Sequence, residues 1–338
     1  MWPSEQKVKK GITLKLDIVI PIYNEEENLG ELKRRLGETC SRIDGCDWQV
    51  IYVNDGSRDR SLPIMLEQHR TDPKFTVLEL SRNFGHQAAI TAGLMYAHGD
   101  VVVFMDGDLQ DPPEVIPDLL ECWRSGVQVV RAQRRSRKES GLRRLGFEAF
   151  HKVFTWISDF PIPSQTGIFG LVDKQALEEI KKLTEKNRFF PGLRSWVGFE
   201  QGIVYYDRQE RAGGEPKQSF KRLIKYALDA IFSFSYKPLK MMTAMGILIS
   251  SIGFALACFF ILRRLLCLEI AQTGFTTLVT LVLFLGGVQL IAIGLLGEYL
   301  ARIYDEVKQR PLFIVRKGYG LSQKESGKNP GESAAIED

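Results

Sequence analysis

The sequence predicts an α/β protein with a parallel, doubly wound sheet, followed by a pair of membrane helices. Short runs of β-branched residues alternate with amphipathic helical patterns between Asp17 and Ala132. The last third contains two long runs without a charged residue. A chain of 338 residues is long enough for one large α/β domain and a smaller second part.

The expected sheet contains five strands, at 17–21, 48–55, 75–80, 100–106 and 127–132. Stretches between them, such as 28–43, place leucines at helical spacing. Ligands of such sheets bind outside the carboxyl ends of the strands, so the polar residues just past those ends are the candidates for a site. These residues are 23–25, 55–57, 81–83 and 106–111.

The uncharged runs at 241–262 and 275–297 each exceed the roughly 20 residues that span a bilayer core. They predict a membrane hairpin, with two buried helices of a soluble protein as the alternative. Lysines and arginines gather before and after the hairpin, and only Arg263 and Arg264 lie in its link. The positive-inside rule therefore predicts that both flanks, and the large domain, are cytoplasmic.

A basic amphipathic segment at 216–240 directly precedes the first run. Its apolar residues, such as Phe220 and Leu223, share one side of a helix, and basic residues such as Lys221 lie on the other. This pattern is typical of a helix in the lipid headgroup layer, although packing on the soluble domain is the alternative. The expected organisation is an N-terminal extension (1–13), a catalytic domain (14–215), the amphipathic segment (216–240), the hairpin (241–297), a juxtamembrane segment (298–318) and a disordered tail (319–338).

Composition narrows the class of protein. A net charge of +4 and a pI near 8.7 are too mild to indicate a nucleic-acid partner. The five cysteines are scattered and include no C-x-x-C pair, which argues against a disulfide framework and a structural zinc site. We therefore expect a reducing, cytosol-facing compartment. The N-terminus is too polar to contain a signal-peptide core.

The stretch "MDGDLQDPPE" (105–114) follows a buried apolar run. Asp106 and Asp108 at the mouth of a strand, with Gln110 offering a further oxygen, suit a hard cation such as Mg²⁺ or Mn²⁺. A surface turn is the alternative for an isolated Asp-x-Asp pair. We interpret Asp111 as the N-cap of a helix that begins at the two prolines.

Two common phosphate-binding motifs are absent from the sequence. It contains no G-x-G-x-x-G after the first strand and no G-x-x-x-x-G-K-[ST], which argues against a dinucleotide oxidoreductase and a P-loop NTPase. The second strand instead ends in Asp55-Gly56. Asp55 could accept a hydrogen bond from a base imide or a ribose hydroxyl, and a simple turn is the alternative.

Five ordered motifs resemble one family: "IVIPIYNEEENL", "VNDGSRDRS", "LSRNFGHQAAITAGL", "MDGDLQDPPE" and "GEYLARIYDEVKQRPLFIV". They are similar to the membrane-anchored polyprenyl-phosphate glycosyltransferases of glycosyltransferase family 2, which include dolichol-phosphate mannose synthases and bacterial undecaprenyl-phosphate glucosyl- and aminoarabinosyltransferases. The resemblance covers about residues 14–317. It implies a GT-A fold (Rossmann-like, with a mostly parallel sheet), a nucleoside-diphosphate sugar donor, a divalent metal and a lipid phosphate acceptor.

The resemblance also implies roles for individual residues. The nucleoside is expected to contact Pro21, Tyr23, Glu25 and Asp55, and the metal and diphosphate are expected to contact Asp106, Asp108 and Gln110. The segment "RAGGEPK" would place Arg211 and Lys217 at the donor diphosphate. The acceptor phosphate is expected at Arg134, with Arg143 or Arg144, although a solvated charge run is the alternative for the cluster at 131–146. His86 either contacts the donor or caps a helix.

One motif departs from the family pattern. Many bacterial members have Thr-Gly-Asp-Phe-Arg-Leu, whereas this chain has "TGIFGL", with Ile168 and Gly170 in place of the acid and the arginine. No residue clearly marks a general base near the expected acceptor site, and Asp159 is the best candidate for one that was overlooked. An acceptor phosphate needs no base, because its oxygen is already anionic.

The function we expect is inverting transfer of glucose from UDP-glucose to undecaprenyl phosphate, at the cytoplasmic face of the inner membrane. Transfer of mannose or aminoarabinose to the same kind of lipid is the alternative. A polysaccharide synthase would need more spans and usually a Gln-x-x-Arg-Trp motif, where this chain has only "LRSWVGFEQ". The expected partners are the nucleotide sugar, the lipid phosphate and the bilayer, and homo-oligomerisation is left open.

Overall fold

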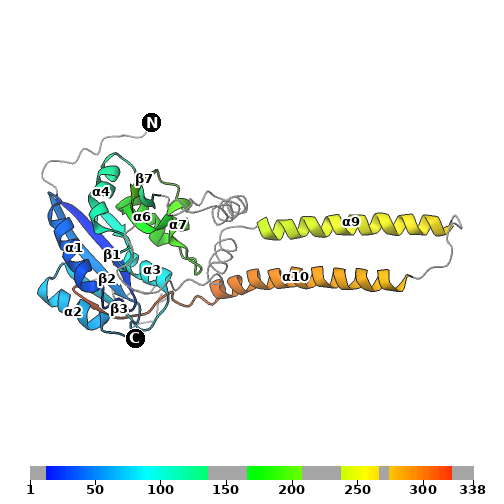
Figure 1. Ribbon diagram of the computed structural model, residues 1–338, viewed down its shortest axis with the longest axis horizontal. Coiled ribbons are helices and arrows are strands. Elements are labelled where there is room, and N and C mark those ends of the chain that lie inside the picture. Colours follow the sequence, from blue (N-terminus) through cyan, green and yellow to red (C-terminus); the bar gives the residue numbers. More distant parts are fainter. Residues whose placement is uncertain (1–12, 136–165, 208–236, 266–273, 322–338) are drawn as a thin grey trace, which may run out of the picture. The chain divides into compact units, whose positions relative to one another are not determined.

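The computed structural model describes residues 13–135, 166–207, 237–265 and 274–321 (Figure 1). These residues form two compact units. The first unit contains a β-sheet with its covering helices, and the second contains two long helices.

The first unit is built on an eight-stranded sheet with the order β7-β5-β6-β4-β1-β2-β3-β8. The strands are β1 (Leu14–Ile22), β2 (Cys46–Asn54), β3 (Phe75–Leu80), β4 (Val101–Phe104), β5 (Val129–Arg134), β6 (Thr166–Asp173), β7 (Gln201–Tyr206) and β8 (Val315–Tyr319). The pairs β4–β1, β1–β2 and β2–β3 are parallel, whereas β6 and β8 run antiparallel to their neighbours. The predicted α/β class with a mostly parallel sheet is therefore confirmed, as are the five predicted strands.

Helices cover both faces of the sheet. On one face lie α1 (Leu29–Ser41), α2 (Ser61–Thr71) and α4 (Ile116–Arg124), which follows the short 3₁₀ helix η1 (Pro113–Val115). On the other face lie α3 (His86–Tyr96), α6 (Lys174–Lys182) and α7 (Phe190–Trp196). Side chains alternate between the two layers, so Ile18 and Ile20 pack on the first face and Val19 on the second. Residues on both faces of the central strands are buried, which explains their continuous apolar runs.

The sequence analysis did not foresee β6, β7 or β8. The "TGIFGL" motif forms most of β6, which lies between β4 and β5 with Phe104 opposite Gly170. Because β6 runs against β4, its first residues lie beside the carboxyl end of β4. The departure from the family pattern therefore lies next to the expected metal-binding loop. β8 pairs with β3 and comes from the segment expected to be juxtamembrane.

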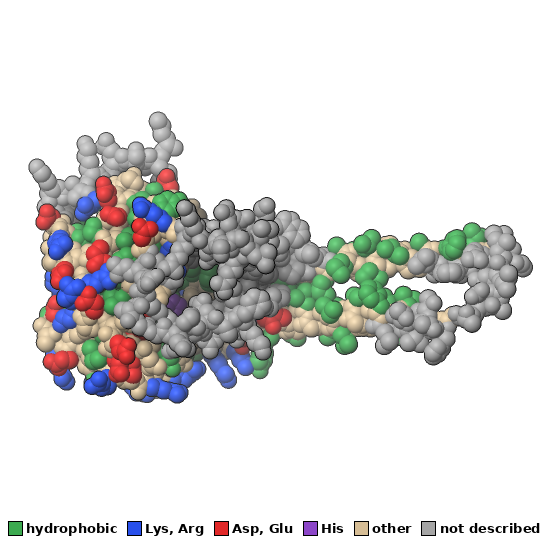
Figure 2. Space-filling view, in the orientation of Figure 1, with side chains coloured by type: hydrophobic (Ala, Val, Ile, Leu, Met, Phe, Trp, Pro, Cys, Tyr) green, Lys and Arg blue, Asp and Glu red, His purple; other side chains and the backbone are tan. Residues whose placement is uncertain are grey.

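The second unit consists of α9 (Lys237–Leu265) and α10 (Phe275–Val307), which contact each other. Apolar side chains are exposed along both helices (Figure 2). Among the described residues, one stretch, Phe284–Val307, is long and apolar enough to cross a membrane, and the apolar stretch Met242–Ala255 is shorter. The two-span hairpin therefore stays a prediction, and residues 208–236 of the catalytic and amphipathic segments lie outside the described residues.

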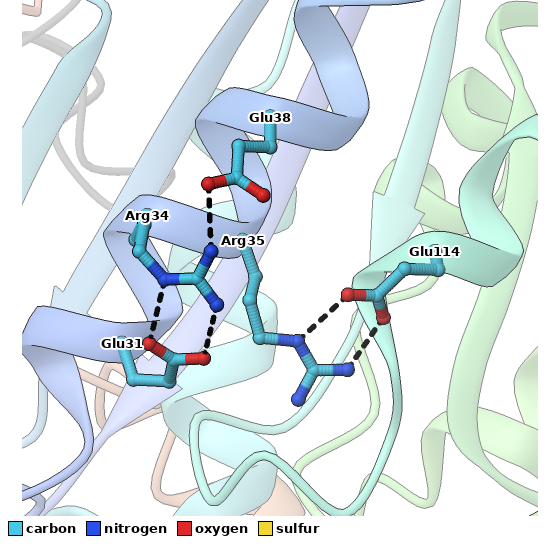
Figure 3. Close-up of polar contacts among 5 residues, drawn as sticks. All are labelled: Glu31, Arg34, Arg35, Glu38 and Glu114. Atoms are coloured by element: carbon cyan, nitrogen blue, oxygen red, sulfur yellow. Dashed lines mark hydrogen bonds and ion pairs between the residues drawn. The ribbon is translucent and has the colours of Figure 1, made fainter.

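A half-buried ion pair joins α1 to η1. The Arg35 side chain donates two hydrogen bonds to the Glu114 carboxylate, at 2.7 and 2.5 Å (Figure 3). Arg35 is only 10% exposed, whereas Glu114 is 53% exposed. The neighbouring Arg34 binds Glu31 and Glu38 within the same helix, fully at the surface. The Arg35–Glu114 pair thus fixes the end of the loop that carries Asp106 and Asp108.

We predict that Glu114→Gln lowers the free energy of unfolding of the first unit by about 1 kcal/mol at pH 7, because the paired carboxylate is partly screened by solvent. Burial alone would raise the pKa of Glu114, but the Arg35 hydrogen bonds outweigh it and hold the pKa below its usual 4.5. The contribution of this pair is therefore complete above about pH 4.5 and is lost as the pH falls through the lower pKa of the folded state. Denaturant unfolding at several pH values measures it.

Glu38→Gln is the matched control, since it removes a carboxylate from an exposed arginine pair on the same helix. It should change stability much less than Glu114→Gln. Equal effects of the two substitutions, or a Glu114→Gln effect that persists at the most acidic pH, would contradict the assigned role of the pair.

Candidate active site

The loops that follow β1, β2, β3 and β4 meet at one edge of the sheet, because these strands are neighbours and parallel. Tyr23 lies at this edge and is 42% exposed, whereas Pro21 is buried at the end of β1. Glu25 is half-buried, and its carboxylate accepts a hydrogen bond from the Asn28 amide at 2.6 Å. The predicted nucleoside-binding residues thus come together at one edge.

Hydrogen bonds interlock the loops after β1 and β2. The Asn24 backbone N–H donates to Ser57 Oγ at 3.2 Å, and the Arg58 N–H donates back to Asn24 Oδ1 at 2.8 Å. The Arg60 N–H likewise donates to Glu26 Oε2 at 2.8 Å. Polar side chains in "YNEEEN" and "DGSRDRS" therefore satisfy the backbone of the opposite loop, which fixes the two loops against each other.

Asp55 is buried at the end of β2 and holds the loop after β3. Its carboxylate accepts hydrogen bonds from the backbone N–H groups of Phe84 at 2.7 Å and Gly85 at 3.0 Å. Burial raises the pKa of Asp55, and these two hydrogen bonds oppose the rise. Gly56 has a φ of +65°, and a Cβ there would lie 2.5 Å from the Asn83 nitrogen. The Asp55-Gly56 pair is thus needed for loop packing, whatever it contacts in a ligand.

A polar groove of about 310 Å³ opens beside Asp55. It lies between the ends of β2 and β3 and is lined by Gly56, Ser57, Arg58, Leu62, Glu79, Leu80, Ser81, Arg82, Asn83 and Arg316. Arg316 comes from β8 and is held by Glu79 at 3.1 Å and by the Ser81 carbonyl at 3.0 Å. The C-terminal strand therefore contributes a cation to the wall of this groove.

The loop after β4 presents Asp106 and Asp108, both partly exposed. The Gln110 N–H donates to Asp108 Oδ1 at 3.1 Å, and Leu109 has a φ of +60°, which makes the turn tight. The Gln110 side-chain oxygen is buried and has no hydrogen-bond partner, so its lone pairs are unused. Two carboxylates and a free amide oxygen are the donor types that Mg²⁺ and Mn²⁺ prefer, so these residues fit the expected cation.

His86 begins α3 and faces the same loop. Its Nε2 lies 3.4 Å from Asp106 Oδ1. Partial burial lowers the pKa of His86, although the Asp108 charge acts in the opposite direction. Gly85, not His86, is the N-cap of α3, so the donor-contact alternative for this histidine stays a prediction.

Asp111 is wrongly predicted as a helix N-cap. The N-cap of η1 is Pro112, and the buried Asp111 carboxylate accepts a hydrogen bond from the Tyr206 hydroxyl at 2.5 Å. Arg134 Nε donates to the same hydroxyl at 3.1 Å, and Arg134 Nη2 lies 3.7 Å from Asp111. A long-range bond has replaced the local cap because Tyr206 at the end of β7 offers a buried donor.

These contacts place Arg134 in the same electrostatic neighbourhood as the loop after β4. Burial alone would lower the pKa of its guanidinium. Tyr206, Asp111 and Asp106 together outweigh burial and hold the pKa above its usual value, so Arg134 is cationic. Gly167 of β6 also approaches Arg134, since a Cβ there would lie 4.0 Å from Nη2. The structure thus places Asp106, Arg134 and the start of β6 near one another.

Several predicted site residues lie outside the described residues, namely Arg143, Arg144, Asp159, Arg211 and Lys217. Tyr206 is the residue that the sequence analysis missed. Its signal is weak, because a tyrosine at the end of an edge strand usually indicates only packing.

A family model described as Glycosyl transferase family 2 matches residues 17–180. The chain is 43% identical to the uncharacterized glycosyltransferase YkcC of Bacillus subtilis over 312 residues, covering 92% of this chain and 96% of that protein. The chain belongs to glycosyltransferase family 2. This glycosyltransferase is also 39% identical to the SfII prophage-derived bactoprenol glucosyl transferase of Shigella flexneri, covering 90% of this chain and 99% of that protein.

Among solved structures, this glycosyltransferase is similar to the mannosyltransferase PcManGT from Pyrobaculum calidifontis in complex with GDP-Man and Mn²⁺. The identity is 15% and the TM-score is 0.41, over 84% of this chain and 88% of that chain.

We predict that Tyr206→Phe lowers the free energy of unfolding of the catalytic domain by about 1–3 kcal/mol, because the buried Asp111 carboxylate loses its hydroxyl donor. Denaturant unfolding measures the loss. Tyr205→Phe is the matched control, since its side chain is 55% exposed on the adjacent position of β7. An equal effect of the two substitutions would mean that the Tyr206 hydroxyl contributes nothing specific.

Proposed function

We propose that this enzyme transfers glucose from UDP-glucose to a polyprenyl phosphate, and that undecaprenyl phosphate is the acceptor. The observation that carries the proposal is the 39% identity, over 90% of the chain, to proteins named bactoprenol glucosyl transferase. The acidic loop after β4, with Arg134 in its electrostatic field, supports the same chemistry.

The donor is proposed to lie along the edge formed by the loops after β1, β2 and β4. In this arrangement Pro21, Tyr23, Glu25 and Asp55 surround the nucleoside, and Arg211 and Lys217 reach the diphosphate. Asp106, Asp108 and Gln110 would hold Mg²⁺ or Mn²⁺, and the bound cation would neutralise the charge that develops on the leaving nucleoside diphosphate. The partly exposed carboxylates leave room for phosphate oxygens.

The acceptor phosphate is proposed to bind Arg134, with Arg143 and Arg144 as further contacts. Arg134 is positioned for this role because Tyr206 and Asp111 fix its guanidinium. Its task is to hold an anionic oxygen in line with the anomeric carbon. The described part of β6 carries Ile168 and Gly170 where many relatives have an acid and an arginine, which favours a reaction without a general base.

The membrane arrangement follows from the same acceptor. We propose a multi-pass protein of the inner membrane, with the catalytic domain in the cytoplasm and spans at 241–262 and 275–297. The candidate span Phe284–Val307 in α10 supports membrane association. The amphipathic segment 216–240 would lie in the headgroup layer, close to a lipid phosphate.

The function is tested with a panel of radiolabelled nucleotide sugars, undecaprenyl phosphate and the detergent-purified protein, followed by lipid extraction. UDP-glucose should be the donor whose label becomes soluble in chloroform. Labelled mannose or aminoarabinose in the lipid phase, with none from UDP-glucose, would overturn the assigned sugar. Label in polymer and not in lipid would overturn the assigned acceptor.

We predict that Asp108→Asn lowers turnover by about two to three orders of magnitude, because one of the charges that hold the cation against the diphosphate is lost. The exposed Asp118→Asn on α4 is the matched control and should retain wild-type turnover. Near-normal turnover by Asp108→Asn at saturating Mg²⁺ and Mn²⁺ would contradict the proposal that Asp108 binds the divalent cation.

A further inference from the structure

Two buried arginines lie beside Gly170, in the part of the sheet that α7 covers. Arg194 comes from α7 and is 0% exposed, and Arg131 comes from β5 and is 8% exposed. A Cβ at Gly170 would lie 2.8 Å from Arg194 Nη1 and 3.3 Å from the Arg131 Cα. Arg131 and Arg134 are three positions apart on β5, so they point to opposite faces of the sheet. This arginine pair is therefore separate from the site around Arg134.

The hydrogen bonds of the pair are incomplete. Arg194 donates from Nη1 to the Ile168 carbonyl at 3.1 Å and from Nη2 to the Gly167 carbonyl at 2.9 Å, while its Nε is buried without a partner. Arg131 Nε and Nη1 are also buried without a partner. Three nitrogen donors of two guanidinium groups thus remain unused inside the protein.

The charges of the pair have no counter-charge within the described part of the chain. Among the residues that the structure describes, no carboxylate forms an ion pair with Arg131 or Arg194. Burial lowers the pKa of both groups, and burial together with the Arg131 charge lowers that of Arg194 to about 9. Arg194 therefore remains cationic at neutral pH, and arginine side chains in proteins generally keep their charge. Buried charges without a counter-charge are strongly unfavourable, so an anion should stabilise the pair.

We propose that Arg131 and Arg194 form a second anion site, which binds the phosphate group of a lipid headgroup or of a free phosphate. Guanidinium groups match phosphate oxygens in geometry and charge. The exposed Tyr205 lies near enough to Arg131 to influence the pKa of Arg131. The Tyr205 hydroxyl offers a further hydrogen-bond donor on the edge strand β7. The Arg194 bonds to the backbone of β6 would couple this anion to the start of β6.

The test uses the full-length protein in neutral detergent, without divalent metal or nucleotide. Thermal unfolding is followed as inorganic phosphate replaces chloride at constant ionic strength. The wild type should show a Tm that rises with phosphate. Arg131→Met should have a higher Tm than the wild type in chloride, because an unpaired buried charge is replaced by an apolar chain. Its rise with phosphate should be clearly smaller than that of the wild type, since only the proposed acceptor site around Arg134 remains.

Two controls separate this site from others. The exposed Arg135→Gln should keep the full rise, and Arg134→Gln, which alters the proposed acceptor site, should keep the part that depends on Arg131. A phosphate-dependent rise in Arg131→Met equal to that of the wild type would overturn the proposal, and so would a Tm in chloride below that of the wild type. Since neither result depends on turnover, failure here leaves the proposed glucosyl transfer untouched.

A further variant tests the site in case Arg131→Met does not fold. Arg131→Lys keeps the charge but loses the forked donors, and should weaken phosphate binding roughly tenfold in a ³¹P NMR titration. Unchanged affinity would contradict the site.

Reconstitution into phosphatidylcholine vesicles with and without phosphatidylglycerol then distinguishes a lipid headgroup from a free phosphate as the source of the anion. A Tm rise with phosphatidylglycerol identifies a lipid headgroup, and a rise with free phosphate alone identifies a soluble phosphate.

Discussion

The hydrogen bond from Tyr206 to the buried carboxylate of Asp111 connects the parts of the catalytic domain on which function depends. Asp111 belongs to the loop after β4, Tyr206 ends β7, and Arg134 ends β5 and donates to the same hydroxyl. A buried carboxylate needs such partners, because an unsatisfied charge in the interior is costly. The bond therefore fixes the acidic loop after β4 and the Arg134 side chain together.

The same loop is held farther along the chain by the Arg35–Glu114 pair, so the segment that follows the acidic turn is anchored to the scaffold at two places. Asp106 and Asp108 precede both anchors, directly after β4, and remain partly exposed. Such a division is physically reasonable, because buried, hydrogen-bonded groups fix the loop while the partly exposed carboxylates stay accessible to a cation. Glycosyl transfer to an anionic acceptor requires positioning more than proton transfer, and this arrangement provides positioning.

The sequence predicts much of the fold because the central strands are buried on both faces and form continuous apolar runs, as in "DIVIP" and "DVVVF". It also predicts Asp106 and Asp108, because strand ends in a parallel sheet converge. It did not indicate β6, since "TGIFGL" contains two glycines and lacks clear alternation. The N-cap interpretation of Asp111 was wrong because a partner 95 residues away outweighed the local rule. Contacts at such separations are set by topology, which periodicity alone does not reveal.

The role of the Tyr206–Asp111 bond is tested most directly by the affinity of the protein for Mn²⁺ in the presence of UDP. Electron paramagnetic resonance measures this affinity for the wild type and Tyr206→Phe. Tyr206 is proposed to touch neither the cation nor the nucleotide, but it fixes the loop that carries Asp106 and Asp108. The account predicts that Tyr206→Phe weakens Mn²⁺ binding about tenfold, as expected when a supporting group of a metal site is lost, while Tyr205→Phe leaves it unchanged. Equal Mn²⁺ affinity in the wild type and Tyr206→Phe would contradict the claim that this bond positions the metal-binding loop.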